Sequence, residues 1–213
     1  SSILINEILA NGVSEPDSEW VELFNNQSFD VNLINFNISE TSSKNITLNV
    51  TIPANGFIVL VENFTLFNAI FPNVNQSGIK IIEYGEIVPS FELANTKGTV
   101  ILYNSSGAKI DTIEYVQSSA QENISIGRYP DGSSALFNLS TLTPGAKNDK
   151  DAPKSNKWIN PLNNNTAISG LVNVILNITD DTTEVNSTMI NFNGTNFSML
   201  KNGDIWTFLW NTR

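Results

Sequence analysis

The residues with the clearest chemical potential in this chain are asparagines that begin Asn-x-Ser/Thr triplets. This triplet is the acceptor for N-linked glycans, and a bulky hydrated glycan requires backbone that faces solvent. Fourteen triplets occur, none with proline in the middle. Random order of the same composition gives roughly half as many. The sequence therefore predicts a glycosylated protein outside the cell, with acceptors at Asn26, Asn37, Asn45, Asn49, Asn63, Asn75, Asn104, Asn123, Asn138, Asn164, Asn177, Asn186, Asn193 and Asn196.

Catalytic chemistry has few side chains to use. The chain contains no histidine and no cysteine, which excludes zinc hydrolysis by those ligands, Ser-His-Asp catalysis and thiol chemistry. A paired-carboxylate mechanism stays open, because Glu7, Glu19 and Glu22 could lie near one another in the fold. Carboxylates with shifted pKa values also occur in structural networks. We expect the structural role and no enzymatic activity.

Calcium is the one ion that the acidic residues could bind. Asn148, Asp149 and Asp151 offer oxygen ligands between the two halves of the chain, and Asp180 and Asp181 offer more in a predicted loop. Calcium takes six to eight oxygen ligands. Lys150 interrupts the first group, so we favour a solvated acidic linker and a turn at 180–181. We expect no cofactor, with calcium as the alternative.

The composition favours a β protein. It also argues against nucleic-acid binding and against a membrane-spanning segment. Asn, Ser and Thr carry most of the polarity, and they favour turns and exposed strand faces over helices. A net charge of −10 repels phosphate backbones. No apolar run reaches transmembrane length. The lack of cysteine in a secreted chain fits bacterial and archaeal surface proteins.

Short apolar runs separated by turn residues indicate a sandwich or barrel. The one predicted helix spans 66–71, with Asn63 or Thr65 as its cap and Pro72 as its end. Residues 104–107 have the composition of a hairpin turn. In the range 48–52 apolar and polar residues alternate, which places Asn49 on a wet face. The predicted strands are 3–9, 20–24, 34–38, 48–52, 57–61, 79–84, 99–103 and 110–116.

A second β domain is predicted after a charged segment that lacks apolar residues. Such segments are typical of domain linkers. We therefore predict domains at 1–148 and 158–213, joined by a linker at 149–157. Beyond the linker, Val172, Val174, Leu176 and Ile178 alternate with Asn173 and Asn177, and Trp206, Phe208 and Trp210 alternate with Ile205 and Thr207. A two-residue period indicates strands with one buried face.

Four sequence blocks, in the same order along the chain, carry a family resemblance. They are Ile5-Asn6-Glu7-Ile8, Glu19-Trp20-Val21-Glu22-Leu23-Phe24-Asn25, Ser125-Ile126-Gly127-Arg128-Tyr129-Pro130-Asp131-Gly132 and Thr143-Pro144-Gly145-Ala146-Lys147-Asn148. Together they resemble the lamin tail domain over about residues 1–148. The resemblance implies an immunoglobulin-like β sandwich, found in nuclear lamins and in secreted or surface proteins of bacteria and archaea. It also implies that Glu19 and Glu22 accept structural hydrogen bonds.

The second half resembles immunoglobulin-like repeats of bacterial surface proteins. The residues concerned are Ile159-Asn160-Pro161, Ser169-Gly170, Ile178-Thr179-Asp180-Asp181 and Trp206-Thr207-Phe208-Leu209-Trp210-Asn211-Thr212. Such repeats continue for two more strands after the tryptophan-rich one. We therefore expect an incomplete sandwich that lacks its last strands. Either the natural protein continues, or another chain supplies the strands by β-augmentation.

The sequence points to a non-catalytic, glycosylated, extracellular structural or adhesive module of a prokaryotic surface protein, and of an archaeal one in particular. Its expected partners are cell-surface or envelope proteins, or copies of itself joined by strand addition. Two alternatives stay open: an accessory module that holds a larger secreted hydrolase or nuclease at the cell surface, and a subunit that assembles with its neighbours by strand donation. A nuclear filament tail is disfavoured, because the chain has no heptad rod.

Overall fold

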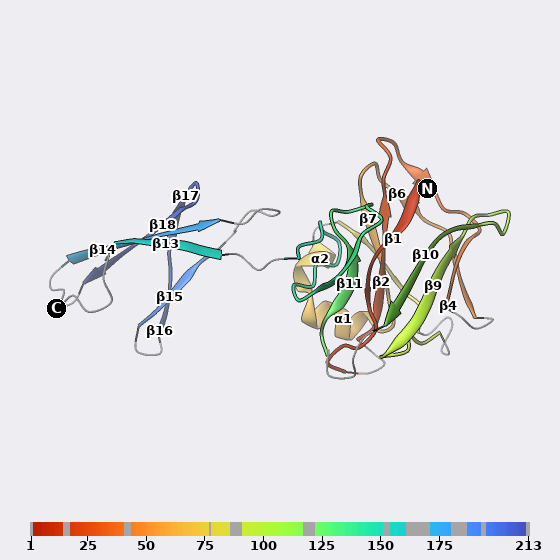
Figure 1. Cartoon of the computed structure of the whole chain (residues 1–213), viewed down its shortest axis with the longest axis horizontal. Coiled ribbons are helices and arrows are strands. Elements are labelled where there is room, and N and C mark those ends of the chain that lie inside the picture. The colour runs from red at the N-terminus through yellow and green to blue at the C-terminus, as the bar shows by residue number, and fades with distance from the viewer. Residues whose placement is uncertain are drawn as a thin grey trace. The chain divides into compact units, whose positions relative to one another are not determined.

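The computed structural model describes residues 2–14, 18–40, 44–76, 78–85, 91–116, 122–150, 154–160, 171–179, 187–192 and 195–211. The chain divides into two compact units, unit 1 at Ser1–Lys150 and unit 2 at Asp151–Arg213. Strands are the main secondary structure of both units, with two short helices in unit 1 (Figure 1), which confirms the predicted all-β class.

Unit 1 is built around two main sheets. The six-stranded sheet has the order β12-β11-β1-β2-β7-β8, and the four-stranded sheet has the order β10-β9-β4-β5. Only the β7–β8 pair is parallel among the pairs of these two sheets. The strands of the first sheet are β12 (Leu136–Leu139), β11 (Ser125–Arg128), β1 (Ile3–Leu9), β2 (Trp20–Asn25), β7 (Phe57–Val61) and β8 (Lys80–Glu83). Those of the second are β10 (Lys109–Val116), β9 (Lys97–Tyr103), β4 (Phe36–Glu40) and β5 (Asn45–Leu48).

The main core of unit 1 lies between these sheets. Ile5, Val21 and Leu23 enter it from the six-stranded sheet, and Ile38 and Leu102 enter it from the four-stranded sheet. All are nearly or fully buried. The strands follow the expected two-residue period, so their intervening residues face away from this core.

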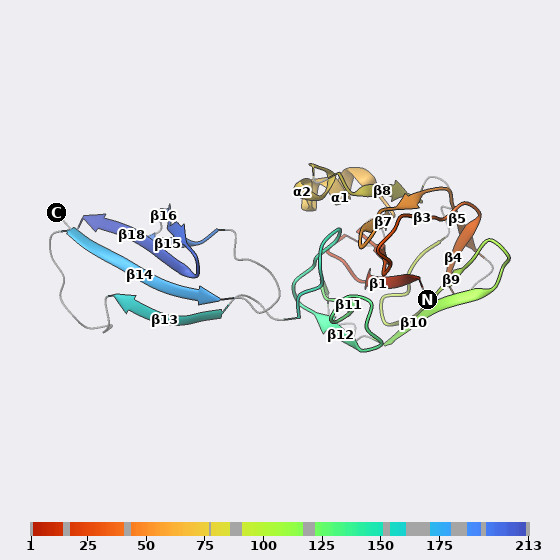
Figure 2. The same cartoon turned by 90° about the horizontal axis from the view of Figure 1, so that it is seen from above.

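A second apolar cluster covers the outer face of the six-stranded sheet. Helix α1 (Phe64–Ile70) and helix α2 (Pro72–Gln76) lie on the side of this sheet opposite the four-stranded sheet (Figure 2). Trp20 and Val59 from the sheet pack there with Phe67 of α1. Because both faces are covered, every residue of β1, β2 and β7 is buried. These strands read as continuous apolar runs interrupted only by residues that have special partners.

Two local predictions about the helical region had different outcomes. Asn63 caps α1, since its side-chain oxygen accepts a hydrogen bond from the Leu66 N–H. Helix α1 ends before Pro72, as predicted, but Pro72 then begins a second helix, α2, that the sequence did not predict. Proline suits the first position of a helix, because its fixed φ matches the helix and its missing N–H would be unpaired there in any case.

The strand predicted at 48–52 is divided in two. Strand β5 ends at Leu48 and pairs with β4, whereas β6 (Thr51–Ile52) pairs with β3 (Val31–Asn32) in a separate small sheet. The chain changes partner at Val50, whose carbonyl accepts a hydrogen bond from the Leu33 N–H. The predicted faces are confirmed, because Leu48 and Ile52 are buried and Asn49 is exposed.

Unit 2 contains a four-stranded sheet and a hairpin. The sheet has the order β13-β14-β18-β17, formed by β13 (Lys154–Asn160), β14 (Leu171–Thr179), β18 (Ile205–Asn211) and β17 (Leu200–Asn202). The hairpin joins β15 (Met189–Phe192) to β16 (Thr195–Ser198). The core gathers Val174, Leu176, Ile178, Met199 and Trp206. The alternation predicted in both long strands is therefore confirmed, while β13 begins within the range predicted as linker.

Replacing a core residue of β9 tests the assignment of its faces. Leu102→Ala is expected to lower the free energy of unfolding by about 2–5 kcal/mol, since Leu102 is fully buried between the sheets. The neighbour Ile101 is half-buried and points away from that core, so Ile101→Ala should cost about 1 kcal/mol or less. Urea denaturation measures both. Equal losses for the two variants would contradict the sandwich.

Candidate functional site

A β-bulge in β1 brings two glutamates together on the outer face of the six-stranded sheet. The register between β1 and β2 shifts between Ile5 and Glu7, and Glu7 then pairs directly with Glu22. Glu22 lies between Val21 and Leu23, which both face the inter-sheet core, so Glu22 faces the other way. Cross-strand partners share a face. The two carboxylates therefore lie side by side, and both are fully buried.

Hydrogen-bond donors surround both carboxylates. Glu22 Oε1 accepts from Asn6 Nδ2 at 2.9 Å, and Glu22 Oε2 accepts from the Gly145 N–H at 2.6 Å. Glu7 Oε1 bonds the hydroxyl of Ser125, and Glu7 Oε2 lies 2.9 Å from Thr143 Oγ1. The segment 143–148 thus supplies a partner to each glutamate. It is one of the sequence blocks that resemble the lamin tail domain.

Burial raises the pKa of both glutamates. The pKa of Glu7 rises to about 7, chiefly because its carboxylate is removed from water and also because Asp131 is negative; bonds from Ser125 and Thr143 oppose this rise. The pKa of Glu22 is raised well above its usual value, first by burial and then by the charge of Glu7. One of the two groups therefore holds a proton near neutral pH.

The third candidate, Glu19, is held by a different element. Its Oε2 accepts a hydrogen bond from the Leu93 N–H at 2.7 Å, in a buried contact. Only Glu7 and Glu22 among the three candidates form the paired site. Their four oxygens all have partners in the protein, and the covering segment keeps them from water. Such an arrangement suits a structural network better than attack on a substrate.

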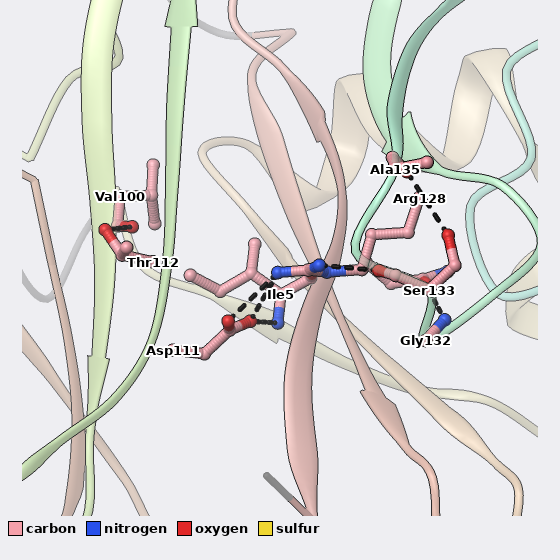
Figure 3. Close-up of polar contacts among 9 residues, drawn as sticks. Ile5, Val100, Asp111, Thr112, Arg128, Gly132, Ser133 and Ala135 are labelled. Atoms are coloured by element: carbon pink, nitrogen blue, oxygen red, sulfur yellow. Dashed lines mark hydrogen bonds and ion pairs between the residues drawn. The ribbon is translucent and has the colours of Figure 1, made fainter.

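An ion pair joins the two sheets beside Ile5 of β1. Arg128 and Asp111 lie 2.9 Å apart and are nearly buried. Asp111 also accepts from the Ile5 N–H at 2.7 Å, and Arg128 Nε donates to the Ile5 carbonyl at 2.7 Å (Figure 3). Strands β1 and β11 pair only at Glu7 and Ile8. The two side chains thus satisfy the backbone groups that the sheet leaves without a strand partner.

The candidate calcium ligands are not gathered into a site within the described residues. The Asn148 side chain is buried and donates to the carbonyls of Asn6 and Arg128. Asp149 is also buried, while Asp151, Asp180 and Asp181 lie outside the described residues. No group of three acidic side chains suited to a metal ion occurs in the part of the chain that the structure describes. Calcium binding stays a prediction.

The structure places the acceptor asparagines at or near the surface wherever it describes them. Asn164, Asn186 and Asn193 lie outside the described residues. Of the rest, Asn37, Asn63, Asn104 and Asn177 are half-buried. The remaining seven are exposed, namely Asn26, Asn45, Asn49, Asn75, Asn123, Asn138 and Asn196.

Buried asparagines occur only outside these triplets within the described residues. Asn6, Asn11, Asn25 and Asn148 are buried, and none begins a triplet. Asn25, for example, donates from Nδ2 to the carbonyls of Phe29, Ile52 and Pro53. The buried asparagines of the described residues therefore all lie outside the triplets, although other non-triplet asparagines, such as Asn32, are exposed.

Fold and site define unit 1 as an all-β sandwich with a buried carboxylate network. The family model for the Lamin Tail Domain matches residues 1–117, more than half of the chain. The chain therefore belongs to the lamin tail domain family, whose fold is immunoglobulin-like and whose members are generally non-enzymatic. A search of curated proteins returned no match. The later blocks of the resemblance, 125–132 and 143–148, lie beyond the matched range but inside unit 1.

Sequence reasoning missed most partners in this network. Asp111 carried no recognisable signal, and the sequence marked Arg128 and Asp131 only as members of a block that resembles the lamin tail domain. The glycine at position 127 is the one sequence signal for this packing. A Cβ there would lie 2.7 Å from Asn148 Nδ2, so a larger residue would displace the Asn148 side chain. Neither helix within the described ranges is long and apolar enough to cross a membrane.

Breaking the ion pair is expected to destabilise unit 1. Arg128→Met leaves Asp111 nearly buried without its cation, which should lower the free energy of unfolding by about 3 kcal/mol. Lys109→Met is the control, because Lys109 is exposed on the same strand as Asp111. It should change stability by less than about 0.5 kcal/mol. Urea denaturation followed by tryptophan fluorescence compares them, and similar losses would refute the role given to Arg128.

The glutamate pair predicts that stability falls as pH rises. Its pKa values are higher in the folded state, so the folded state binds more protons than the unfolded state above pH 4.5. Stability from Glu7 is full below pH 4.5 and is lost as the pH rises to about 7, by an amount on the order of 3 kcal/mol. Denaturation at a series of pH values measures the loss. The control Glu114→Gln, at an exposed site, should show the same dependence of stability on pH as the unmodified chain. If the unmodified chain shows no loss of stability between pH 4.5 and 7, the result would count against the buried pair.

Proposed function

We propose that this chain is a non-catalytic, glycosylated, extracellular structural or adhesive module of a prokaryotic surface protein, and specifically of an archaeal one. The observation that carries the proposal is the separation of asparagines by burial. No described acceptor asparagine is buried, whereas the four buried asparagines lie outside the triplets. A glycan requires this kind of exposure.

The architecture of unit 1 supports a structural role. Its six-stranded sheet is packed on both faces, and the buried side chains of Glu7, Glu22 and Arg128 are paired or hydrogen-bonded. Acidic side chains held in this way stabilise a fixed shape and have no free oxygen directed at a substrate. Surface polarity comes largely from Asn, Ser and Thr, and the absence of cysteine suits a prokaryotic envelope. The partners that we propose are other envelope proteins.

Exposed apolar residues favour a second candidate, a subunit that assembles with copies of itself. Leu171, Leu200 and Leu209 are 69%, 77% and 62% exposed. They share the face of the β14–β18–β17 sheet that is turned away from the core of unit 2. Exposed patches of this kind often mark contact surfaces. Light scattering coupled to size exclusion distinguishes the candidates, since a monomer at high concentration would reject self-assembly.

Intact-mass measurement on protein made in its native host tests glycosylation. When residues 1–213 are produced there, we expect a mass above the 23.4 kDa of their bare polypeptide. Asn45→Gln should remove the mass of one glycan, because Asn45 is exposed in a triplet. Asn32→Gln should remove none, because Asn32 is equally exposed but begins no triplet. A bare-polypeptide mass for the native protein would reject the glycan coat.

A further inference from the structure

The hydroxyl of Thr143 lies within hydrogen-bond distance of two acceptor oxygens, and its one proton can serve only one of them. This hydroxyl lies 2.9 Å from Glu7 Oε2 and 3.1 Å from Asn148 Oδ1. A threonine hydroxyl has one proton to give. Asn148 directs its oxygen toward Thr143, because its Nδ2 donates to the carbonyls of Arg128 and Asn6 at 2.8 and 3.2 Å. If Glu7 were ionised, Thr143 would face two acceptors with one proton.

The hydrogen-bond partners of Glu22 indicate which of the two glutamates carries the negative charge. Both of its oxygens accept from N–H groups, of Asn6 and Gly145, that cannot accept in return. A proton on Glu22 would therefore have no acceptor among these partners. A proton on Glu7, by contrast, has the Thr143 oxygen as its acceptor, and Thr143 can then donate to Asn148. Burial raises the pKa of both glutamates, but the directions of these bonds agree when the one proton of the pair is on Glu7 and Glu22 is charged.

Among the described residues, no cation near Glu7 offers an alternative. The charged groups that act on it are Glu22 from β2 and Asp131 from the turn after β11, and both are negative. Arg128 of β11 is bonded to Asp111, to the Ile5 carbonyl and to the Ser133 carbonyl at 2.6 Å. In the covering segment, Lys147 is exposed and Asp149, just after it, is buried. Like charges this close and this buried do not both ionise readily.

We propose that Glu7 is a neutral carboxylic acid in folded unit 1, and that its proton forms a latch, Glu7 to Thr143 to Asn148, which fastens the segment 143–148 to the six-stranded sheet. The segment is further held by Glu22 at the Gly145 N–H and by Asp131 at the Asn148 N–H, at 3.0 Å. It leads directly to the end of unit 1 at Lys150. Alkaline conditions remove the proton and loosen this segment before the sandwich itself unfolds.

A titration of the unmodified protein locates the proton. In the full chain labelled with ¹³C at glutamate carboxyl carbons, the Glu7 resonance should keep the position of a protonated acid at pH 5.5. It should move only as the pH passes about 7. The exposed Glu114 serves as the reference resonance. A Glu7 carboxyl that is already ionised at pH 5.5 would overturn the proposal, without any substitution that might disturb folding.

Two variants that remove the same charge separate the roles of the glutamates. In Glu7→Gln the amide can donate permanently to Thr143, so the Gly145 and Asn148 amides should keep their hydrogen-exchange protection from pH 6 to pH 8. In the unmodified chain this protection should fall about tenfold over that range. In Glu22→Gln the new amide opposes an N–H donor, so protection at Gly145 should be lost at both pH values.

Each result of the exchange experiment bears on the latch. A loss with Glu7→Gln and retention with Glu22→Gln would place the proton on Glu22 and overturn the proposal. Protection in the unmodified chain that does not change with pH would also overturn it. Glu114→Gln should behave as the unmodified chain. Exchange at the Leu102 amide, in the inter-sheet core, reports whether the sandwich remains folded throughout.

Discussion

The main electrostatic constraint on unit 1 is the burial of two glutamates opposite one another, with no cation between them among the described residues. Removing two carboxylates from water is costly, and their repulsion adds to that cost. The protein offsets it with hydrogen-bond partners from three separate parts of the chain: Asn6 in β1, Ser125 in β11, and Thr143 with Gly145 in the segment 143–148. The network therefore requires β1, β2, β11 and the segment 143–148 to be assembled together, which links residues more than a hundred positions apart.

The bulge in β1 makes this possible. Without the extra residue, strict alternation would not allow Ile5 and Ile8 to share the inter-sheet core. With it, Glu7 turns to the outer face, while Asp111 and Arg128 bind the backbone groups of Ile5. One irregularity thus serves both polar networks of unit 1, one on each side of the six-stranded sheet.

Family membership gives the fold of unit 1, and the glycan coat is our proposal for its surface. The two are compatible in physical terms. Buried amides and carboxylates hold the backbone, while none of the described triplet asparagines is buried. The latch concerns neither the fold class nor the glycans. It concerns the last segment of unit 1, whose attachment depends on a titratable group.

The sequence by itself determined the all-β class, most strand positions, the cap of α1, the buried faces of β14 and β18, and the family. These follow from local periodicity, composition and short motifs, which need no knowledge of distant contacts. Tertiary structure decided the division of 48–52, the start of α2 at Pro72, and the separation of Glu19 from the other two glutamates. It also decided the roles of Asp111, Arg128 and Asn148. Each depends on which distant backbone group lies nearby, and that information exists only once the sheets have paired.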